Sequence, residues 1–301
     1  MDTARVLELR GTFQVRPRQV VHAPTALFDG LEVIRCFGFD VREPEPVRRR
    51  KIPGGTVKIV FALDGVFGGR RVEPTALVVG LHDHAGIAEH AGRMHSVQIQ
   101  LNPLAARRLL GVPLHELRNT TVRLDDLVGR PALELTEHLA ESGGWPDRFA
   151  AVAAFLRGQF ADAEAHDPAV AHAVRLLQRS AGRASVSALA EEIGWSHRHF
   201  RRRFADQVGL PPKDYGALVK FSGALTALAG TPAPDLSAVA AHFGYYDQSH
   251  LTRACHRFAG LSPGRLIRTP TEDLPERERP RLPVSAQVVA DSSNTGGGVR
   301  F

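Results

Sequence analysis

The sequence is poor in cysteine and in long hydrophobic runs, and each shortage excludes a class of protein. Two cysteines, Cys36 and Cys255, among 301 residues cannot form a disulfide framework or a four-cysteine zinc module. The longest apolar run is about the length of Ala150–Leu156, far short of the roughly 20 residues that a membrane-spanning helix needs. The first ten residues contain no apolar segment of a secretory signal. We therefore expect a cytoplasmic protein without a membrane partner.

Positive charge is in excess, and it is concentrated in one segment. The chain has 38 Lys and Arg against 32 Asp and Glu, a net charge of +6. Residues 166–270 contain 13 basic and 7 acidic residues, so this segment alone carries the +6 and the remainder is balanced. Concentrated positive charge is typical of a protein that binds a polyanion such as nucleic acid, although a solvated helical surface has the same composition.

Residues 1–165 are predicted to form a β-rich regulatory domain that is closed by helices. Short runs of β-forming residues alternate with turn residues up to about residue 101, and from Pro103 the apolar spacing becomes helical. We expect an α+β fold with a barrel or cupin-like sheet, followed by a disordered tail over residues 271–301. The clearest strands are Val33–Val41, Val57–Leu63, Ala76–Leu81 and Met94–Leu101, with turns at 44–46, 53–55, 64–65 and 68–69.

The basic segment contains an internal repeat. Val186–Trp195 aligns with Leu236–Tyr245 at an offset of 50 residues without a gap, and the landmarks that follow align once one residue is inserted into the second copy. Each copy has the pattern of a short helix, a turn at a glycine and a second helix, which is a helix-turn-helix. We therefore predict an all-α domain with two helix-turn-helix units over residues 166–270.

The second helix of each unit has an apolar side and a polar side. Spacing of 100° per residue places Phe200, Phe204 and Val208 toward a core, and Arg198, Arg201 and Arg202 on the opposite side. In this motif the second helix enters the major groove of DNA, where Arg pairs with guanine. A solvated helical bundle is the alternative, and the duplication with matching glycines argues against it. In the second unit Leu251, Cys255 and Phe258 are predicted to face inward, with Ser249, Thr252 and Arg253 outward and Gln248 at the helix N-terminus.

Residues of about 170 to 268 resemble the DNA-binding domain of AraC-type transcriptional regulators. Residues 194–196, 200–204, 209–212, 244–245, 248–251 and 260–263 are the landmarks, while Cys255 stands where the family usually has an aromatic residue. The resemblance implies a sequence-specific regulator whose two recognition helices, joined by a helix over Lys213–Ala229, enter successive major grooves of double-stranded DNA. It also implies RNA polymerase as a partner if the protein is an activator, and base contacts from Arg198, Arg201, Arg202, Gln248, Ser249, His250 and Arg253.

Shorter stretches of residues 1–165 resemble the N-terminal domains of some regulators of this family. The stretches are residues 97–103, 110–117 and 124–129. Such domains sense effectors or mediate dimerisation, so the resemblance implies a small-molecule effector or a second copy of the chain as a further partner.

A metal-dependent cupin-like enzyme domain fused to a DNA-targeting module is the alternative function. His82 and His84, with Glu89 five residues later, have the H-x-H-x4-E spacing of metal-binding cupins, and alternate residues of one strand would place both imidazoles on one face. The other glycine and histidine landmarks of that pattern are missing or out of order. We therefore interpret both histidines as loop residues and expect no metal, no cofactor and no catalytic residue.

Overall fold

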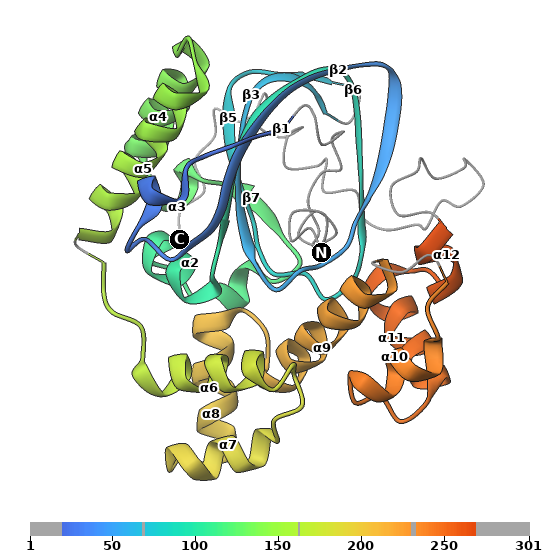
Figure 1. The fold of residues 1–301 in the computed structure, drawn as a ribbon. Helices are drawn as coiled ribbons and strands as arrows, with labels where there is room; N and C mark the ends of the chain where they lie inside the picture. Colours follow the sequence, from blue (N-terminus) through green and yellow to red (C-terminus); the bar gives the residue numbers. More distant parts are fainter. Residues whose placement is uncertain (1–19, 68–69, 162, 230–232, 269–301) are drawn as a thin grey trace, which may run out of the picture.

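The computed structural model describes residues 20–67, 70–161, 163–229 and 233–268, without the side chains of residues 43–49, 66–67, 70–72 and 89–90. The described part consists of an antiparallel sheet that is followed by helices (Figure 1). The tail over residues 271–301, predicted to be disordered, lies outside the described residues. Among the helices of the described ranges, none is long and apolar enough to cross a membrane.

The sheet has seven strands in the described residues, in the order β1-β2-β6-β3-β5-β7, with β4 paired to β3. All four predicted strands are confirmed, and β2, β3 and β6 are longer than predicted. No pairing between the outer strands β1 and β7 is found among the described residues, so a closed barrel stays a prediction. The strands are β1 (Val20–His22), β2 (Val33–Lys51), β3 (Val57–Phe67), β4 (Arg70–Val72), β5 (Thr75–Val79), β6 (Gly86–Leu101) and β7 (Thr121–Arg123).

Two of the predicted turns lie inside strands, so those predictions are wrong. Residues 44–46 belong to β2, where the pairing with β6 shifts register between Glu43 and Val47. Residues 64–65 belong to β3, which shifts register against β6 at the same place. Such bulges leave residues of one strand unpaired, and proline, which has no N–H to donate, is tolerated there. The predicted turn at residues 53–55 does separate β2 from β3, while residues 68–69 lie outside the described residues.

Helices cover one face of the sheet, as predicted. β6 directs Val97, Ile99 and Leu101 toward them, and all three side chains are 0% exposed. The helices α4 (Arg130–Glu141) and α5 (Trp145–Ala161) lie along the sheet, where α4 contacts β3 and β5 and α5 contacts β2 (Figure 1). The elements are η2 (Thr25–Phe28), α2 (Pro103–Leu110), η3 (Leu114–Leu117), α3 (Asp125–Val128), α4 (Arg130–Glu141) and α5 (Trp145–Ala161).

The rest of the described chain is helical and contains the two predicted helix-turn-helix units. The first of these helices begins at Pro168, because the side chain of Asp167 accepts a hydrogen bond from the backbone N–H of Ala169 and Pro168 occupies the first turn. The predicted linking helix is confirmed as α9. The helices are α6 (Pro168–Arg179), α7 (Val186–Ile193), α8 (His197–Val208), α9 (Pro212–Ala229), α10 (Leu236–His242), α11 (Gln248–Ala259) and α12 (Pro263–Arg268).

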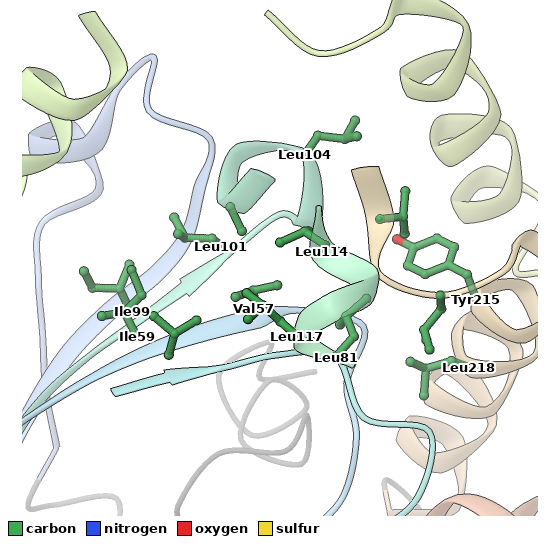
Figure 2. Close-up of a cluster of buried hydrophobic side chains, with 14 of the residues drawn as sticks. Val57, Ile59, Leu81, Ile99, Leu101, Leu104, Leu114, Leu117, Tyr215 and Leu218 are labelled. Atoms are coloured by element: carbon green, nitrogen blue, oxygen red, sulfur yellow. The ribbon is translucent and has the colours of Figure 1, made fainter. Parts of the chain in front are cut away.

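One continuous apolar core joins the sheet to these helices. Leu114 and Leu117 of η3 lie between the sheet residues on one side and Tyr215 and Leu218 of α9 on the other (Figure 2). α8 also contacts η3, and a Cβ on Gly209 would lie 3.1 Å from the carbonyl oxygen of Leu114. Gly209 therefore serves two purposes, since its φ of +92° ends α8 in the left-handed conformation and its missing side chain admits η3.

Truncation of Leu114 tests the contribution of this contact to stability. Leu114 is 1% exposed, so Leu114→Ala should lower the free energy of unfolding by about 2–5 kcal/mol through lost burial and a cavity. Urea unfolding followed by circular dichroism measures the change. Leu133→Ala on α4 is the control, because that side chain is 42% exposed and its loss should cost no more than about 0.5 kcal/mol. Equal losses for the two variants would contradict the proposed contribution of Leu114.

Candidate nucleic-acid interface

Local capping and a buried aromatic side fix the orientation of α8. The Ser196 side chain accepts a hydrogen bond from the backbone N–H of His199 at 3.3 Å and so starts the helix. Phe200, Phe204 and Val208 are each 0% exposed, which confirms the predicted inward side. The opposite side of α8 consequently faces away from the core.

Three arginines lie on this outward side. Arg198, Arg201 and Arg202 are exposed and line an open groove of about 530 Å³ together with His197, Ala205 and Pro211. No acidic partner for these three side chains is found in the part of the chain that the structure describes. Arg203 differs from them, because its guanidinium lies 3.3 Å from the carboxylate of Asp167. The charge of the groove is therefore available to an anion from outside the protein.

The second unit presents a smaller and more polar surface on α11. Leu251 and Cys255 are 0% exposed and Phe258 is 2% exposed, so the predicted inward side is confirmed. Burial raises the pKa of the Cys255 thiol to about 12, which makes this side chain a packing residue. Thr252, predicted to face outward, is only partly exposed, and its hydroxyl donates to the carbonyl of Gln248. The exposed residues of the predicted set here are Gln248, Ser249, His250 and Arg253.

Both units are attached to α9. That helix contacts α8 in the first unit and α10 and α11 in the second. The rings of Phe221 and Phe258 stack at 5.0 Å, and the ammonium of Lys220 donates to the carbonyl of Gly244 at 3.0 Å. The two sets of predicted DNA-contacting residues therefore lie on separate helices that one linking helix holds together.

The predicted metal candidates lie in a loop. His82 and His84 fall between the end of β5 and the start of β6, so the loop interpretation is confirmed and the single-strand arrangement is wrong. Each imidazole Nδ1 lies within hydrogen-bonding distance of an oxygen, His82 with the Gly80 carbonyl at 2.9 Å and His84 with Asp83 at 2.8 Å. The side chain of Glu89 is outside the described part. Among the described side chains, no three His, Cys, Asp or Glu residues gather as metal ligands would.

Asp83, between the two histidines, is the center of an ion-pair network that sequence analysis missed. Its carboxylate accepts hydrogen bonds from Arg118 and from the side chain of Asn119. Arg118 also lies 4.0 Å from Asp214 at the start of α9, and Asp214 in turn accepts a hydrogen bond from Arg257 of α11 at 2.7 Å. Charged residues thus connect a loop of the sheet to the second helix-turn-helix unit. No short motif marks these residues, because they are far apart in the sequence.

The stability that Asp83 contributes should depend on pH. Burial alone raises its pKa, but hydrogen bonds from Arg118, His84 and Asn119 outweigh burial and lower the pKa below the usual value of 3.8. The ionised carboxylate therefore stabilises the fold above pH 3.8, and this contribution is lost as the pH falls through the folded-state pKa. Asp83→Asn should reduce the free energy of unfolding at pH 7 and have a smaller effect at pH 3.

Urea unfolding at the two pH values measures this difference. Asp29→Asn is the matched control, because Asp29 is an exposed residue of the same type. A deficit for Asp83→Asn that is the same at pH 3 as at pH 7 would contradict the role given to the ionised carboxylate.

Two family models match the chain. A model described as a helix-turn-helix domain matches residues 189–269, which include α8 to α12. A model described as a domain of unknown function (DUF6597) matches residues 30–123, which include the sheet from β2 to β7. No curated protein matches the chain.

Several solved structures resemble the chain at low identity. The C-terminal domain of AraT, a response regulator from Geobacillus stearothermophilus, is 21% identical over 40% of this chain and 97% of its own, with a TM-score of 0.33. ToxT from Vibrio cholerae is 8% identical over 77% of this chain and 97% of its own, with a TM-score of 0.42. ToxT with a bound unsaturated fatty acid is 7% identical over 77% and 94%, with the same TM-score. Because these TM-scores are below 0.5, the similarities by themselves assign no property to this chain.

Proposed function

We propose that the chain is a DNA-binding transcriptional regulator whose C-terminal helix-turn-helix domain is of the AraC type, and that it binds specific duplex sequences through α8 and α11. The observation that carries this proposal is the exposed set Arg198, Arg201 and Arg202, which has no acidic partner in the described chain and lies opposite a buried aromatic side. An arginine fork matches the O6 and N7 atoms of guanine in the major groove.

Each helix is expected to enter one of two successive major grooves. α8 supplies strong, charge-assisted contacts, while α11 supplies Gln248, Ser249, His250 and Arg253, whose contacts are weaker or depend on DNA shape. The shared attachment of both units to α9 supports this arrangement, because two helices held by one scaffold bind a site of defined spacing.

Residues 166–270 are proposed as the DNA-binding domain and residues 1–165 as the regulatory domain, with 271–301 as a tail. The change from the sheet with α2 to α5 to the helices α6 to α12 supports this division (Figure 1). A barrel or cupin-like form of the sheet is also a proposal, and the curvature of β2 and β6 supports it.

Single substitutions of the three arginines test the DNA-binding proposal. Arg198→Ala, Arg201→Ala or Arg202→Ala should weaken binding to the selected operator by about 1–3 kcal/mol and relax the base preference at the contacted position. The operator is obtained by selection of bound duplexes from a random pool, and mobility shifts give the dissociation constants. Affinity of the wild type should fall steeply with salt, because phosphate contacts release counterions.

Arg203→Ala is the matched control on the same helix. Its guanidinium is paired with Asp167, so its loss should change the base preference little. Unchanged specific affinity in all three arginine variants, or a salt-independent wild type, would refute the proposal.

The N-terminal domain is proposed to sense a small effector on the second face of its sheet, with dimerisation as the alternative. Ser96, Gln98 and Gln100 alternate along β6 with core residues and are 0%, 1% and 2% exposed. The Ser96 hydroxyl and the Gln98 amide nitrogen have no hydrogen-bond partner among the residues that the structure describes. A buried polar group without a partner costs about 1–3 kcal/mol, and an effector that supplies the partner accounts for keeping it.

Basic side chains accompany this polar face. In the strand register, Arg35 of β2 and Lys58 of β3 both lie beside Gln100. Burial, with a smaller effect from Arg35, lowers the pKa of Lys58 to about 8. Two nearby cations favour an effector with an anionic or strongly polar group.

Gln98→Met tests whether this face is kept polar at the expense of stability. Replacing the amide, whose nitrogen lacks a partner among the described residues, by an apolar side chain of similar shape should raise the free energy of unfolding of the effector-free protein by about 1 kcal/mol. Gln100→Met is the control and should destabilise, because Gln100 does have an interaction partner. Thermal unfolding measures both. A loss of stability in Gln98→Met as large as that in Gln100→Met would contradict the assignment.

We propose that the protein regulates transcription without catalysing a reaction. It is proposed to act in the cytoplasm, with RNA polymerase as a partner if it is a transcriptional activator. Both cysteine thiols are buried, and burial raises the pKa of each to about 12. Neither thiol is therefore a nucleophile at neutral pH, and both suit a reducing compartment.

A further inference from the structure

The second helix-turn-helix unit contains one residue that the first unit lacks. Up to Trp195 and Tyr245 the two copies align at an offset of 50 residues. The next helix begins at the cap Ser196 in the first copy and at the cap Asp247 in the second, an offset of 51. In both, the cap side chain accepts a hydrogen bond from the backbone N–H three residues later. The extra residue is Tyr246.

Tyr246 is almost completely exposed. Its side chain is 94% exposed, compared with 6% for the preceding Tyr245. No ring contact of Tyr246 is found among the described residues, and only its backbone N–H is engaged, with the His250 imidazole at 3.4 Å. Single exposed apolar residues are common on protein surfaces. Tyr246, however, is an additional aromatic residue in a tight turn, and packing in the core does not explain its presence there.

The position of Tyr246 in the chain places it beside the proposed DNA-contacting residues of α11. It directly precedes the cap of α11, next to the exposed residues Gln248 and Ser249. The N-terminal end of a recognition helix is the end that contacts base edges, and residues around it reach the sugar-phosphate backbone. We propose that Tyr246 contacts the DNA backbone at the edge of the groove that α11 enters, with the phenol O–H donating to a phosphate oxygen and the ring covering a deoxyribose.

An uncharged contact to the DNA backbone suits the second unit, whose outward side is less basic than that of the first. The outward side of α8 has three arginines, whereas that of α11 has Arg253 alone in the predicted set. Backbone contacts position a protein on duplex DNA without specifying sequence, and neutral hydroxyl groups make them as well as cations do. A neutral donor releases no counterion, so its contribution should be independent of salt. This inference rests on the proposed DNA binding and adds a residue with a distinct salt signature.

Binding of Tyr246→Ala and Tyr246→Phe to the selected operator and to a scrambled duplex tests the inference. Tyr246→Ala should bind both duplexes about tenfold more weakly, with an unchanged slope of log Kd against log salt. Tyr246→Phe should lose about threefold, because it retains the ring and loses the hydroxyl. Arg202→Ala provides the contrast, since removal of a cation from the DNA interface should lower the salt slope, whereas removal of the neutral Tyr246 side chain should not. Leu133→Ala, an exposed apolar truncation on α4, should bind like the wild type.

Nitration by tetranitromethane gives a measurement that needs no variant. The chain has three tyrosines, and Tyr215 and Tyr245 are 1% and 6% exposed, so Tyr246 is the one accessible to the reagent. Operator DNA should protect Tyr246 from nitration, as peptide mass analysis would detect.

Several results would overturn the inference. They are full nitration in the presence of saturating operator, unchanged affinity of Tyr246→Ala, or a loss confined to the operator, which would indicate a base contact. Loss of transcriptional activity with intact DNA binding would instead assign Tyr246 to a protein partner. Failure of the proposed function looks different, because the wild type itself would then show no specific, salt-dependent binding.

Discussion

The placement of the outward-facing side chains of α8 depends on the contact of Leu114 and Leu117 with the first helix-turn-helix unit. η3 lies between the sheet and the helices, and Gly209 at the end of α8 admits it closely. Tyr215 and Leu218 extend the same apolar cluster into α9, to which α11 is also attached. The sheet and both helix-turn-helix units therefore share one close-packed interior, and such interiors transmit strain.

Ion pairs reinforce this arrangement and decide which arginines remain available. Arg107 of α2 lies 3.7 Å from Asp206 of α8, and Arg118 lies near Asp214 of α9. Arg50 of β2 donates to the carbonyl of Ala259 at the end of α11 at 3.0 Å. These basic residues are used within the protein. The arginines of α8 that face the groove have no such partner in the described chain, so their charge remains available at that surface.

Local rules predicted the helical third of the chain well. The buried positions Phe200 and Phe204 and the linking helix α9 follow from apolar spacing along a helix, which the sequence contains directly. The sheet was predicted less well. The prolines at 44 and 46 indicate a turn by local rules, yet a bulge opposite β6 keeps them inside a strand. Bulges depend on a partner strand about 45 residues away, and local patterns do not contain that information.

The candidate site divides in the same way. The sequence by itself determined the repeat, the outward side of α8 and its positive charge, because each depends on residues within one or two helical turns. Only the tertiary structure showed that Arg203 and Arg257 are engaged by carboxylates while Arg198, Arg201 and Arg202 have no such partner in the described chain. It alone showed that the loop of His82 and His84 presents Asp83 to Arg118, and that Tyr246 lies outside the core. Pairing, burial and exposure are set by contacts between segments distant in the chain, and those contacts exist only in the folded protein.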